Sequence, residues 1–462
     1  MTRTITILGA GFVGVTTAAL FANAGYKVYL VELNAERLDT IKQGRSFFYE
    51  EGLDPLIARA VSDNRLIPTN SYAVSVPQSQ FVFSCVGTPD RIDGSSNLDY
   101  IYASAKEAIQ HLRSGTIFAQ KSTVPPGTGE KIEKIFADSG KDVAYVSNPE
   151  FLREAKAIED TLFFDHVVVG GNDFEAVGQV LDVYRSVQAN RDSLLLLAGL
   201  KKPSNTGAGK YFAVERADAE LIKVAANAFL SLKITYSNFI AMLADQAGAD
   251  AQNVLSIMGL DWRIGSAFLN PGRGFGGGCF PKDNSGLVDA SVAFNVDSGL
   301  IETVLRLNSR MPGYVIESLR KHLGGSLAGK RVALLGLSFK AGTSDTRKSP
   351  AITLANLLYK SEASVIAFDP QASEEIRNEK ELWAPIAIGT SLEEALEGAD
   401  AVVIGTAWPE FRDFGLHEMM ALMAGNTVYD ADSCFKHLTT ADIRKLWDQG
   451  THYLAVGRSN IV

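Results

Sequence analysis

Residues 4–14 read TITILGAGFVG, an apolar run followed by three closely spaced glycines. The run is typical of a short buried strand, and an apolar helical pattern continues from the last glycine to Ala24. A second strand-like run at 27–31 ends at Glu32. Strand, glycine turn, helix, strand and terminal acid together form a fingerprint of dinucleotide binding, which is far more specific than a lone glycine triplet. The chain is therefore predicted to begin with a βαβ unit that holds a dinucleotide.

The three glycines have different roles in such a unit. The first makes the tight turn, the second lets the pyrophosphate approach the backbone, and the third lets the helix pack on the strand. The phosphates lie at the helix N-terminus, which favours anions, and the acid accepts hydrogen bonds from a ribose diol. A 2′-phosphate there would meet a like charge, so NAD is expected rather than NADP. The predicted cofactor contacts are Gly9, Gly11, Phe12, Val13, Gly14 and Glu32.

The composition fits a protein of two or three domains, because 462 residues exceed one hydrophobic core. A net charge of −9 argues against a nucleic-acid surface. Three cysteines fit a reducing compartment, and the six histidines show no metal-ligand spacing, so no metal is expected. No stretch is apolar enough to span a bilayer, and glycines and threonines interrupt the N-terminal apolar stretch too often for a signal peptide. The predicted location is the cytoplasm.

Strand and helix patterns alternate through roughly the first 200 residues, as in a doubly wound sheet. Three further apolar runs, at 81–86, 116–120 and 143–147, each stop at a turn with small or polar residues. Ligands bind at the carboxyl ends of strands in open α/β sheets, so these turns are candidate walls of a site. Ordinary loop chemistry explains each turn equally well when it is taken alone.

One cysteine lies in a loop with few side chains, GFGGGCFPKD at 274–283. The glycines let a substrate approach the backbone closely, and a neighbouring cation favours the thiolate over the thiol. Cys279 is therefore a candidate nucleophile, although a free cysteine is usually a small, inert packing residue. The glycine density and the charged residues Lys282 and Asp283 favour the reactive interpretation. Cys85, in a strand-like run, is predicted to be a core residue.

The pattern from 215 to 247 predicts one long helix with apolar residues at near-helical spacing. Lys223 and Asn227 are four residues apart and share a face of it. Such a pair usually belongs to a solvated helix face. Here apolar residues surround Asn227, and a partly desolvated lysine can act as an electrophilic or acid-base group.

A third section begins near residue 329, where 331–337 reads as a strand and a turn. It resembles a second dinucleotide half but lacks the three-glycine spacing, so it is expected to bind a nucleotide differently or only to shape the cleft. Lys340 and Arg347 can neutralise phosphate groups. Solvated charges in a polar loop are the simpler interpretation of these two residues taken alone.

Together these patterns predict an α/β fold of two Rossmann-like doubly wound domains joined by a central helical domain with a long helix. The expected boundaries are 1–210 for the N-terminal NAD-binding domain, 211–325 for the central helical domain and 326–462 for the C-terminal domain.

Five motifs occur in an order and spacing that resemble one family. They are GAGFVG at 9–14, CVGTP at 85–89, KSTVPPGT at 121–128, NPEFLRE at 148–154 and FGGGCFPKD at 275–283. The set is similar to that of the nucleotide-sugar dehydrogenases, the UDP-glucose/GDP-mannose dehydrogenase family, and it covers nearly the whole chain. Residues 261–265, DWRIG, resemble the branch that uses UDP-glucose rather than GDP-mannose or UDP-N-acetylhexosamines.

The resemblance implies a four-electron oxidation in which a sugar's primary alcohol becomes a carboxylate and two NAD are reduced. It implies that a water or carboxylate takes the hydroxyl proton, that the thiol attacks the aldehyde, and that a thiohemiacetal and then a thioester form. The lysine and asparagine of the long helix stabilise oxyanions, and an aspartate holds the hydrolytic water. The implied catalytic residues are Cys279, Lys223, Asn227, Asp283, Thr123 and Glu150.

The resemblance also implies binding residues and a partner. Further NAD contacts are Val86, Gly87, Thr88, Ser122, Thr123, Glu154, Lys282 and Arg347. Contacts to the nucleotide sugar, with UDP-glucose expected, are Phe151, Leu152, Arg153, Glu154, Lys223, Asn227, Arg263, Phe268, Leu269, Asn270, Gly272, Phe275, Gly276 and Lys340. In the family Arg263 reaches the sugar of a neighbouring subunit, which implies a homodimer or higher homo-oligomer with the long helix at its core.

Three positions depart from the family pattern. Gly278 stands where a serine is usual, Ala267 lies where a basic residue is common, and Asp432 replaces an arginine. The charge at Asp432 has the opposite sign to a substrate-binding cation, for which Arg458 is a possible replacement. The oxidation of TDP-glucose, GDP-mannose or a UDP-N-acetylhexosamine therefore stays open as an alternative.

Two rivals come from other classes. A two-electron dehydrogenase of the hydroxyacid type also joins a glycine-rich domain to a helical domain with lysine and asparagine, and it would not need the cysteine. A non-catalytic NAD-binding scaffold would bind NAD without turnover, which the intact set of candidate catalytic residues argues against.

Overall fold

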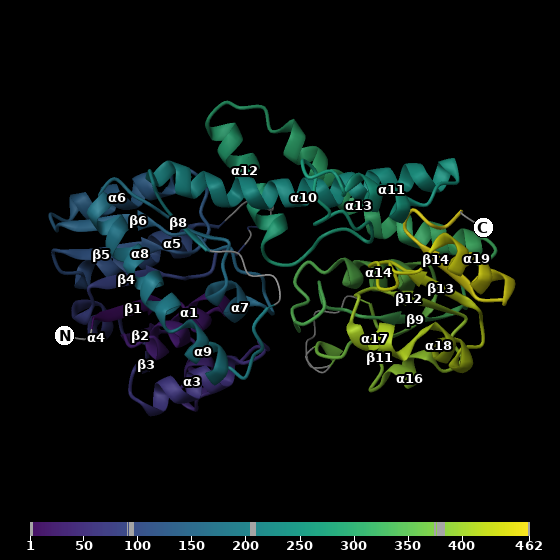
Figure 1. Ribbon diagram of the computed structural model, residues 1–462, viewed down its shortest axis with the longest axis horizontal. Coiled ribbons are helices and arrows are strands. Elements are labelled where there is room, and N and C mark those ends of the chain that lie inside the picture. Colours follow the sequence, from purple (N-terminus) through teal and green to yellow (C-terminus); the bar gives the residue numbers. More distant parts are fainter. Residues whose placement is uncertain are drawn as a thin grey trace. The chain divides into compact units, whose positions relative to one another are not determined.

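The computed structural model describes residues 3–89, 91, 97–203, 209–373, 376 and 384–460. Contacts within the chain divide it into two compact units. The first contains residues 1–226 and 285–296, and the second contains 227–284 and 297–462. The predicted fold class, two parallel-sheet units with a helical region and a long helix, is confirmed (Figure 1). The three predicted domain boundaries stay a prediction.

The first unit contains an eight-stranded sheet of order β3-β2-β1-β4-β5-β6-β7-β8 in the part of the chain described. Its strands are β1 Thr4–Leu8, β2 Lys27–Val31, β3 Leu66–Thr69, β4 Phe81–Ser84, β5 Thr116–Gln120, β6 Val143–Ser147, β7 His166–Gly170 and β8 Lys210–Val214. All neighbours pair in parallel except β6 and β7. The predicted strands at 4–8, 27–31, 116–120 and 143–147 are confirmed, and the run at 81–86 is a strand only to Ser84.

Successive strand residues point to opposite faces of this sheet, and both faces are covered. Ile5 and Ile7 belong to one buried cluster, whereas Leu8 belongs to another. The helices are α1 Phe12–Asn23, α2 Ala35–Lys42, α3 Leu53–Ser62, α4 Tyr72–Ser75, α5 Asp99–His111, α6 Thr128–Asp138, α7 Ala157–Leu162, α8 Phe174–Ala189 and α9 Arg191–Leu197, with a 3-10 turn η1 at Val76–Gln78. Burial on both faces explains why the central strands read as continuous apolar runs.

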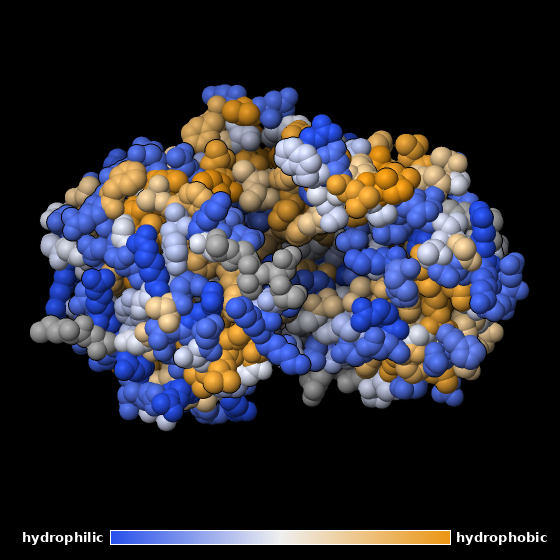
Figure 2. Space-filling model, viewed as in Figure 1, coloured by the Kyte–Doolittle hydropathy of each residue, from blue (hydrophilic) through white to orange (hydrophobic). Residues whose placement is uncertain are grey.

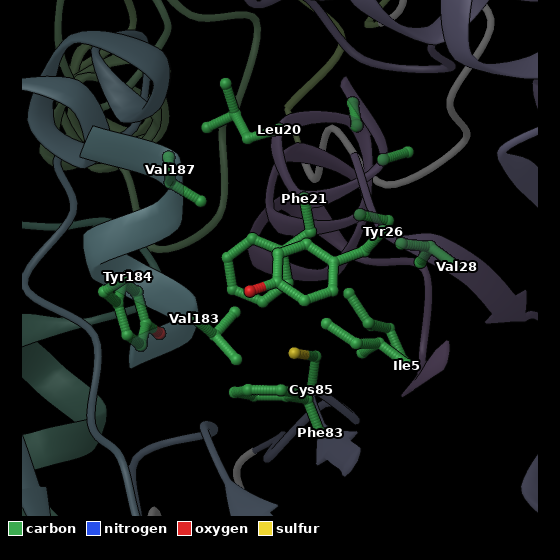
Figure 3. Packing of buried hydrophobic residues seen from close by; sticks show 14 of the residues in the cluster. Ile5, Leu20, Phe21, Tyr26, Val28, Phe83, Cys85, Val183, Tyr184 and Val187 are labelled. Carbon is green, nitrogen blue, oxygen red and sulfur yellow. The ribbon is translucent and has the colours of Figure 1, made fainter. Parts of the chain in front are cut away.

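Aromatic rings fill the core between α1, α8 and the sheet. The Phe21 ring lies edge-on to Phe83 and Tyr184, with centroids 5.4 and 5.7 Å away (Figure 3). Cys85 lies in the same cluster, and burial raises the pKa of its thiol to about 12. The prediction that Cys85 is a core residue is confirmed.

The second unit contains a parallel sheet of order β11-β10-β9-β12-β13-β14. Its strands are β9 Arg331–Leu335, β10 Ser364–Phe368, β11 Ala387–Ile388, β12 Ala401–Ile404, β13 Thr427–Asp430 and β14 His452–Ala455. Its helices are α11 Ala251–Met258, α13 Gly299–His322, α14 Pro350–Lys360, α16 Leu392–Leu396, α17 Pro409–Phe414, α18 Leu416–Leu422 and α19 Thr440–Asp448. Val332 and Leu334 pack on one face of the sheet, and Ala333 and Leu335 pack on the other.

Two helices carry residues of both units. The long helix predicted at 215–247 is α10, Arg216–Ala247, and α12 is Phe280–Ala293. Glu220 fixes the beginning of α10, because its carboxylate accepts the amides of Gly127 and Gly129 at 2.8 Å each. Burial raises the pKa of this carboxyl group, against the effect of the two backbone donors. None of the helices in the described residues has the length and hydrophobicity that crossing a bilayer requires.

Candidate active site

The first sheet reverses its strand order between β1 and β4, which is where open α/β sheets bind ligands. The turn after β1 contains Gly9, whose φ is +91°, and a Cβ there would lie 2.8 Å from the Cα of Val86. A Cβ on Gly14 would lie 2.0 Å from the carbonyl oxygen of Gly9. Both positions therefore require glycine for packing reasons alone.

Gly11 differs from its two neighbours. It precedes α1, and a Cβ there would meet no atom of the described residues within 4 Å. Space beside a helix N-terminus is what a pyrophosphate needs. Glu32, at the end of β2, is partly exposed, and its Oε1 accepts the amide of Asn34 at 2.8 Å. The carboxylate thus has a fixed position at the edge where a ribose diol is expected.

The turns after β4 and β5 are joined by a hydroxyl group. Ser122 Oγ donates to the carbonyl oxygen of Val86 at 2.7 Å, and the amide of Ser122 donates to Ser84 at 3.0 Å. Ser122 therefore holds the 86–88 turn against the turn that contains Thr123, which is partly buried. The sequence predicted both turns as walls of one site, and the structure brings them together.

A buried chain of hydrogen bonds connects the turns after β5 and β6, and the sequence did not indicate it. Lys121 Nζ donates to the hydroxyl of Tyr184 at 2.9 Å, and that hydroxyl donates to Asn148 Oδ1 at 2.6 Å. Asn148 Nδ2 in turn donates to the carbonyl oxygen of Val168 at 3.0 Å. Lys121 and Asn148 lie two residues before Thr123 and Glu150, so the chain fixes the loops that carry two candidate catalytic residues.

Glu150 and Lys223 form a buried ion pair in the first unit. Lys223 Nζ lies 3.5 Å from Glu150 Oε1, and both side chains are less than one tenth exposed. The ammonium group also lies 5.2 Å from the centre of the Phe151 ring. The second carboxylate oxygen of Glu150 accepts the amide of Leu152 at 2.5 Å. Four of the predicted site residues are thereby collected around one buried charge pair.

In the second unit, Cys279 is the residue directly before α12, and it is exposed. Its carbonyl oxygen accepts the amide of Asp283 at 2.8 Å. The sulfur therefore lies at a helix N-terminus, where the dipole favours negative charge. Cys85 and Cys434 are buried, and burial raises the pKa of both thiols. Of the three cysteines, Cys279 alone is accessible to a substrate.

A buried carboxylate lies one turn after the thiol. Asp283 Oδ2 accepts Asn227 Nδ2 at 2.5 Å, and its Oδ1 lies 2.8 Å from Lys282 Nζ. Asn227 is further held by its helix, since its carbonyl oxygen accepts Ser231 Oγ at 2.8 Å. Asn284 links the same helices, because its Nδ2 donates to Ser231 Oγ at 2.8 Å. The structure thus brings Asn227, Lys282 and Asp283 together beside the cysteine loop.

An asparagine that was not predicted from the sequence holds the cysteine loop through two hydrogen bonds. Asn308, on α13, accepts the amide of Phe275 at 2.8 Å and donates to its carbonyl oxygen at 2.9 Å. The loop also lies against residues 339–348: a Cβ on Gly276 would lie 2.3 Å from the Lys348 carbonyl oxygen, and one on Gly277 would lie 2.7 Å from the Phe339 ring. The glycines are therefore required by close packing.

Models of three domains match the chain in sequence order. They are the UDP-glucose/GDP-mannose dehydrogenase family's NAD binding domain at residues 3–188, its central domain at 217–310 and its UDP binding domain at 333–437. The chain belongs to the UDP-glucose/GDP-mannose dehydrogenase family. The resemblance predicted from the five motifs is confirmed.

Full-length relatives support this assignment. A UDP-glucose 6-dehydrogenase of Rhizobium meliloti is 36% identical over 98% of this chain and 99% of its own length. A UDP-glucose 6-dehydrogenase of Bacillus subtilis is 33% identical over 99% of this chain and 98% of its own length. The solved structure of a UDP-glucose dehydrogenase from Pyrobaculum islandicum has a TM-score of 0.86 and 32% identity, and covers 99% of this chain and 98% of that chain.

The cofactor of this dehydrogenase family member is NAD, as predicted. The first unit fits the cofactor, because two glycines are forced by packing while Gly11 leaves room at the N-terminus of α1. The fixed carboxylate of Glu32 lies beyond the next strand, as a ribose contact requires.

The second sheet reverses its strand order between β9 and β12, but its turn differs from that of the first. The amides of Leu337 and Ser338 both donate to Asp369 Oδ2, at 2.7 and 2.9 Å. A carboxylate of the protein thus occupies amides that could otherwise receive a phosphate. Lys340 follows this turn, with Nζ 5.7 Å from the centre of the Phe339 ring. A phosphate bound here would need side-chain cations such as Lys340 more than the backbone.

Three predicted binding arginines form ion pairs with carboxylates that are two to seven residues away in the sequence. Arg263 contacts Asp261, and Arg347 contacts Asp345, each with two nitrogens within 2.9 or 3.0 Å of the carboxylate. Arg153 pairs with Asp160, and this partner raises the pKa of the guanidinium group. These pairs hold planar, exposed guanidinium groups in one orientation.

Several of the remaining predicted residues are within or close in sequence to the cysteine loop. The rings of Phe268 and Phe275 lie 6.2 and 5.8 Å from the ring of Phe280, so they form one aromatic cluster. Leu269 is buried and Asn270 is exposed. The other predicted contacts, at Val13, Gly87, Thr88 and Glu154, are at least partly exposed.

Proposed function

We propose that this protein oxidises UDP-glucose to UDP-glucuronate in two successive NAD-dependent steps on one thiol. Membership of the family and the names of the full-length relatives support the substrate class. The observation that carries the mechanism is the accessible Cys279 at the start of α12, one turn from the Asn227–Asp283–Lys282 network.

The first oxidation needs a base and a fixed alcohol. Bound NAD accepts one hydride from the sugar's C6 in each oxidation. Glu150, or a water held by it and Thr123, takes the hydroxyl proton, which leaves an aldehyde. Phe151 and Leu152 line the hexose. Lys223, buried beside Glu150, stabilises the negative charge that develops on the C6 oxygen.

The second oxidation takes place on the enzyme's sulfur. The thiolate of Cys279 forms a bond to C6, and the aldehyde oxygen takes a proton to give a thiohemiacetal. Loss of a second hydride from C6 and of the hydroxyl proton leaves a thioester. Asn227 donates to the developing oxyanion, and Asp283 holds the water that attacks the acyl carbon. The C–S bond then breaks, which releases the carboxylate, returns Cys279 as the thiolate and gives two protons to solvent. Each sugar therefore consumes two NAD and one water.

The nucleotide is proposed to bind in the second unit. Lys340 follows the turn after β9 and neutralises the pyrophosphate, and the aromatic cluster of Phe268 and Phe275 packs on the base or hexose. Arg347 and Lys282 are proposed to neutralise the cofactor phosphates.

The test is to incubate the protein with UDP-glucose and NAD and to count NADH formed per sugar consumed. The expected ratio is two. A ratio of one contradicts the covalent mechanism and favours a two-electron dehydrogenase, and no NADH at all favours a scaffold that only binds NAD. TDP-glucose, GDP-mannose and a UDP-N-acetylhexosamine are tested as alternative substrates. If one of them is oxidised and UDP-glucose is not, the proposed substrate is wrong, but the proposed class of reaction still stands.

We also propose that the chain forms a homodimer through an apolar face of α10 and α11. This face, the α10–α11 face, consists of large exposed hydrophobic side chains of α10, of α11 and of the turn that follows α11: Tyr236, Phe239, Leu243, Val254, Ile257, Leu260 and Trp262. Figure 2 shows hydrophobic surface at the upper right of the molecule, where Figure 1 places α11. Exposed apolar area of this kind usually marks an interface. A second copy is the expected occupant, because the family resemblance places the sugar-binding Arg263 of one subunit at the site of another.

The expected result is that Phe239→Glu converts a dimer to a monomer in light scattering, because a charge would be buried in an apolar interface. Phe174→Glu is the matched control, since Phe174 is an exposed phenylalanine on α8 in the first unit. A wild-type protein that is monomeric at micromolar concentration would contradict the proposal.

A further inference from the structure

A buried arginine lies directly before the cysteine loop. Arg273 is 1% exposed and is among the largest fully buried side chains of the described residues. Its Nη2 donates to the carbonyl oxygen of Phe339 at 2.9 Å and to Thr406 Oγ1 at 3.2 Å, and its Nη1 donates to Ser349 Oγ at 3.3 Å. The connection between β9 and α14 and the turn after β12 therefore meet on one guanidinium group.

The position of this group is informative. Phe339 lies in the turn after β9 and Thr406 in the turn after β12, and β9 and β12 flank the point where the strand order reverses. Thr406 Oγ1 also donates to the carbonyl oxygen of Ser338 at 2.6 Å, and this hydrogen bond joins the turn after β12 to the turn after β9. Arg273 thus connects the expected nucleotide site of this sheet to the loop that carries Cys279.

Asp432 is the counter-ion of Arg273. Its Oδ1 lies 3.5 Å from Arg273 Nε, and its Oδ2 accepts the amide of Ala407 at 2.9 Å. A buried guanidinium group without a carboxylate would be strongly destabilising. Arg458, the other cation considered for this role, pairs instead with Asp250 at 2.8 Å. The acidic residue at 432 is explained by the cation of Arg273, directly before the cysteine loop.

Hydrogen bonds that involve the backbone fix residues 271–273 against residues 431–433. The amide of Arg273 donates to the carbonyl oxygen of Ala431 at 2.7 Å, and Ser433 Oγ donates to that of Pro271 at 2.7 Å. A Cβ on Gly272 would lie 2.7 Å from the same Ala431 oxygen. Arg273 and Asp432 therefore face each other across two segments in fixed register.

We propose that Arg273, with Asp432 as its counter-ion, is a positioning residue that holds the cysteine loop in register with the nucleotide-binding turns. A nucleotide sugar bound at Lys340 then presents its hexose to Cys279 at a fixed separation. The inference rests on the proposed function for its substrate, but the position of the thiol can be tested without turnover.

The test compares Arg273→Met, Arg273→Lys and Asp432→Asn with the wild type. Arg412→Met, an exposed arginine on α17 paired with Asp413, is the matched control. Three quantities are measured on each folded protein: the rate at which iodoacetamide alkylates Cys279, the protection of that thiol by UDP-glucose without NAD, and the Kd for UDP.

Arg273→Met is expected to change the alkylation rate at least fivefold, to abolish protection by UDP-glucose, and to lower kcat by about 10²-fold, because a shift of about 1 Å in a reacting group has an effect of that size. The Kd for UDP is expected to stay within about twofold, since UDP lacks the hexose. Arg273→Lys is expected to recover part of the protection, and Asp432→Asn to show the same changes to a smaller extent.

Equal loss of UDP binding and of thiol protection would overturn the inference, because Arg273 would then only support the nucleotide pocket. The double variant Arg273→Met with Asp432→Asn is expected to be no worse than Arg273→Met alone, and additive effects would also overturn it. If Arg273→Met does not fold, Asp432→Asn decides the question through the same three measurements. If the wild type does not oxidise UDP-glucose, the proposed function fails, while an altered alkylation rate without ligand still supports the positioning role and an unaltered rate rejects it.

Discussion

Cys279→Ser is expected to stop catalysis after a single turnover and to leave a sugar on the enzyme. A serine in this position can pass through a hemiacetal to an ester, but an alkoxide is a much poorer leaving group than a thiolate. We expect kcat to fall by at least about 10³-fold, with a burst of NADH of no more than two per subunit. Intact-protein mass spectrometry should then show the added mass of one UDP-glucuronyl group.

The matched variants separate the chemistry from packing. Cys279→Ala should show neither burst nor adduct, whereas Cys434→Ala should keep turnover because Cys434 is a buried residue of the second unit. Full turnover by Cys279→Ala would reject the covalent mechanism. If the sugar in the Cys279→Ser protein is attached to a residue other than 279, that other residue is the nucleophile.

The central strands of both sheets could be predicted because strands that are buried on two faces consist of consecutive apolar residues. β1 and β9 show this clearly, each with four of five residues fully buried. Edge strands lack such a signal: β8 is mostly exposed and β11 has two residues. The long helix α10 was predictable because its apolar spacing persists over many turns.

The candidate site was predictable where its chemistry is local in sequence. Lys223 and Asn227 are one helical turn apart, and Asp283 follows Cys279 by one turn, so the helix period relates each pair. Asp261 and Arg263 likewise form a local pair that their spacing permits. These contacts need no knowledge of the tertiary fold.

The residues that position the site could not be predicted, because their partners are far apart in the chain. Asn308 clamps Phe275 from a different helix, and Tyr184 joins two loops from α8. Arg273 precedes the cysteine loop and belongs to none of the recognised motifs, and its role depends on segments that meet it only in the folded unit. In the sequence, Asp432 left the identity of the nucleotide sugar open, because its charge is opposite to that of a substrate-binding cation; in the structure it is the partner of Arg273.

Lys223→Met is expected to lower kcat with UDP-glucose by about 10²- to 10³-fold, the range found when one oxyanion donor is removed. Met fills similar volume but donates no hydrogen bond and carries no charge. It also leaves Glu150 buried without its cation, and breaking one side of such a pair costs about 3–5 kcal/mol. Steady-state kinetics should show a change in kcat that is larger than the change in KM, and thermal unfolding should show a lower Tm.

Glu150→Gln and the double variant Lys223→Met with Glu150→Gln together decide whether the lysine acts in the reaction or only neutralises Glu150. In the double variant the buried charge is gone from both sides, so the Tm should recover, while kcat should stay below that of Glu150→Gln alone. Equal kcat in these two variants, which both lack the proposed base, would mean that Lys223 is only a structural counter-ion. Lys106→Met, on the exposed face of α5, should change neither quantity. These variants thereby measure two contributions of the buried pair. Two neutral residues can replace its contribution to stability, but they cannot replace its contribution to the transition state.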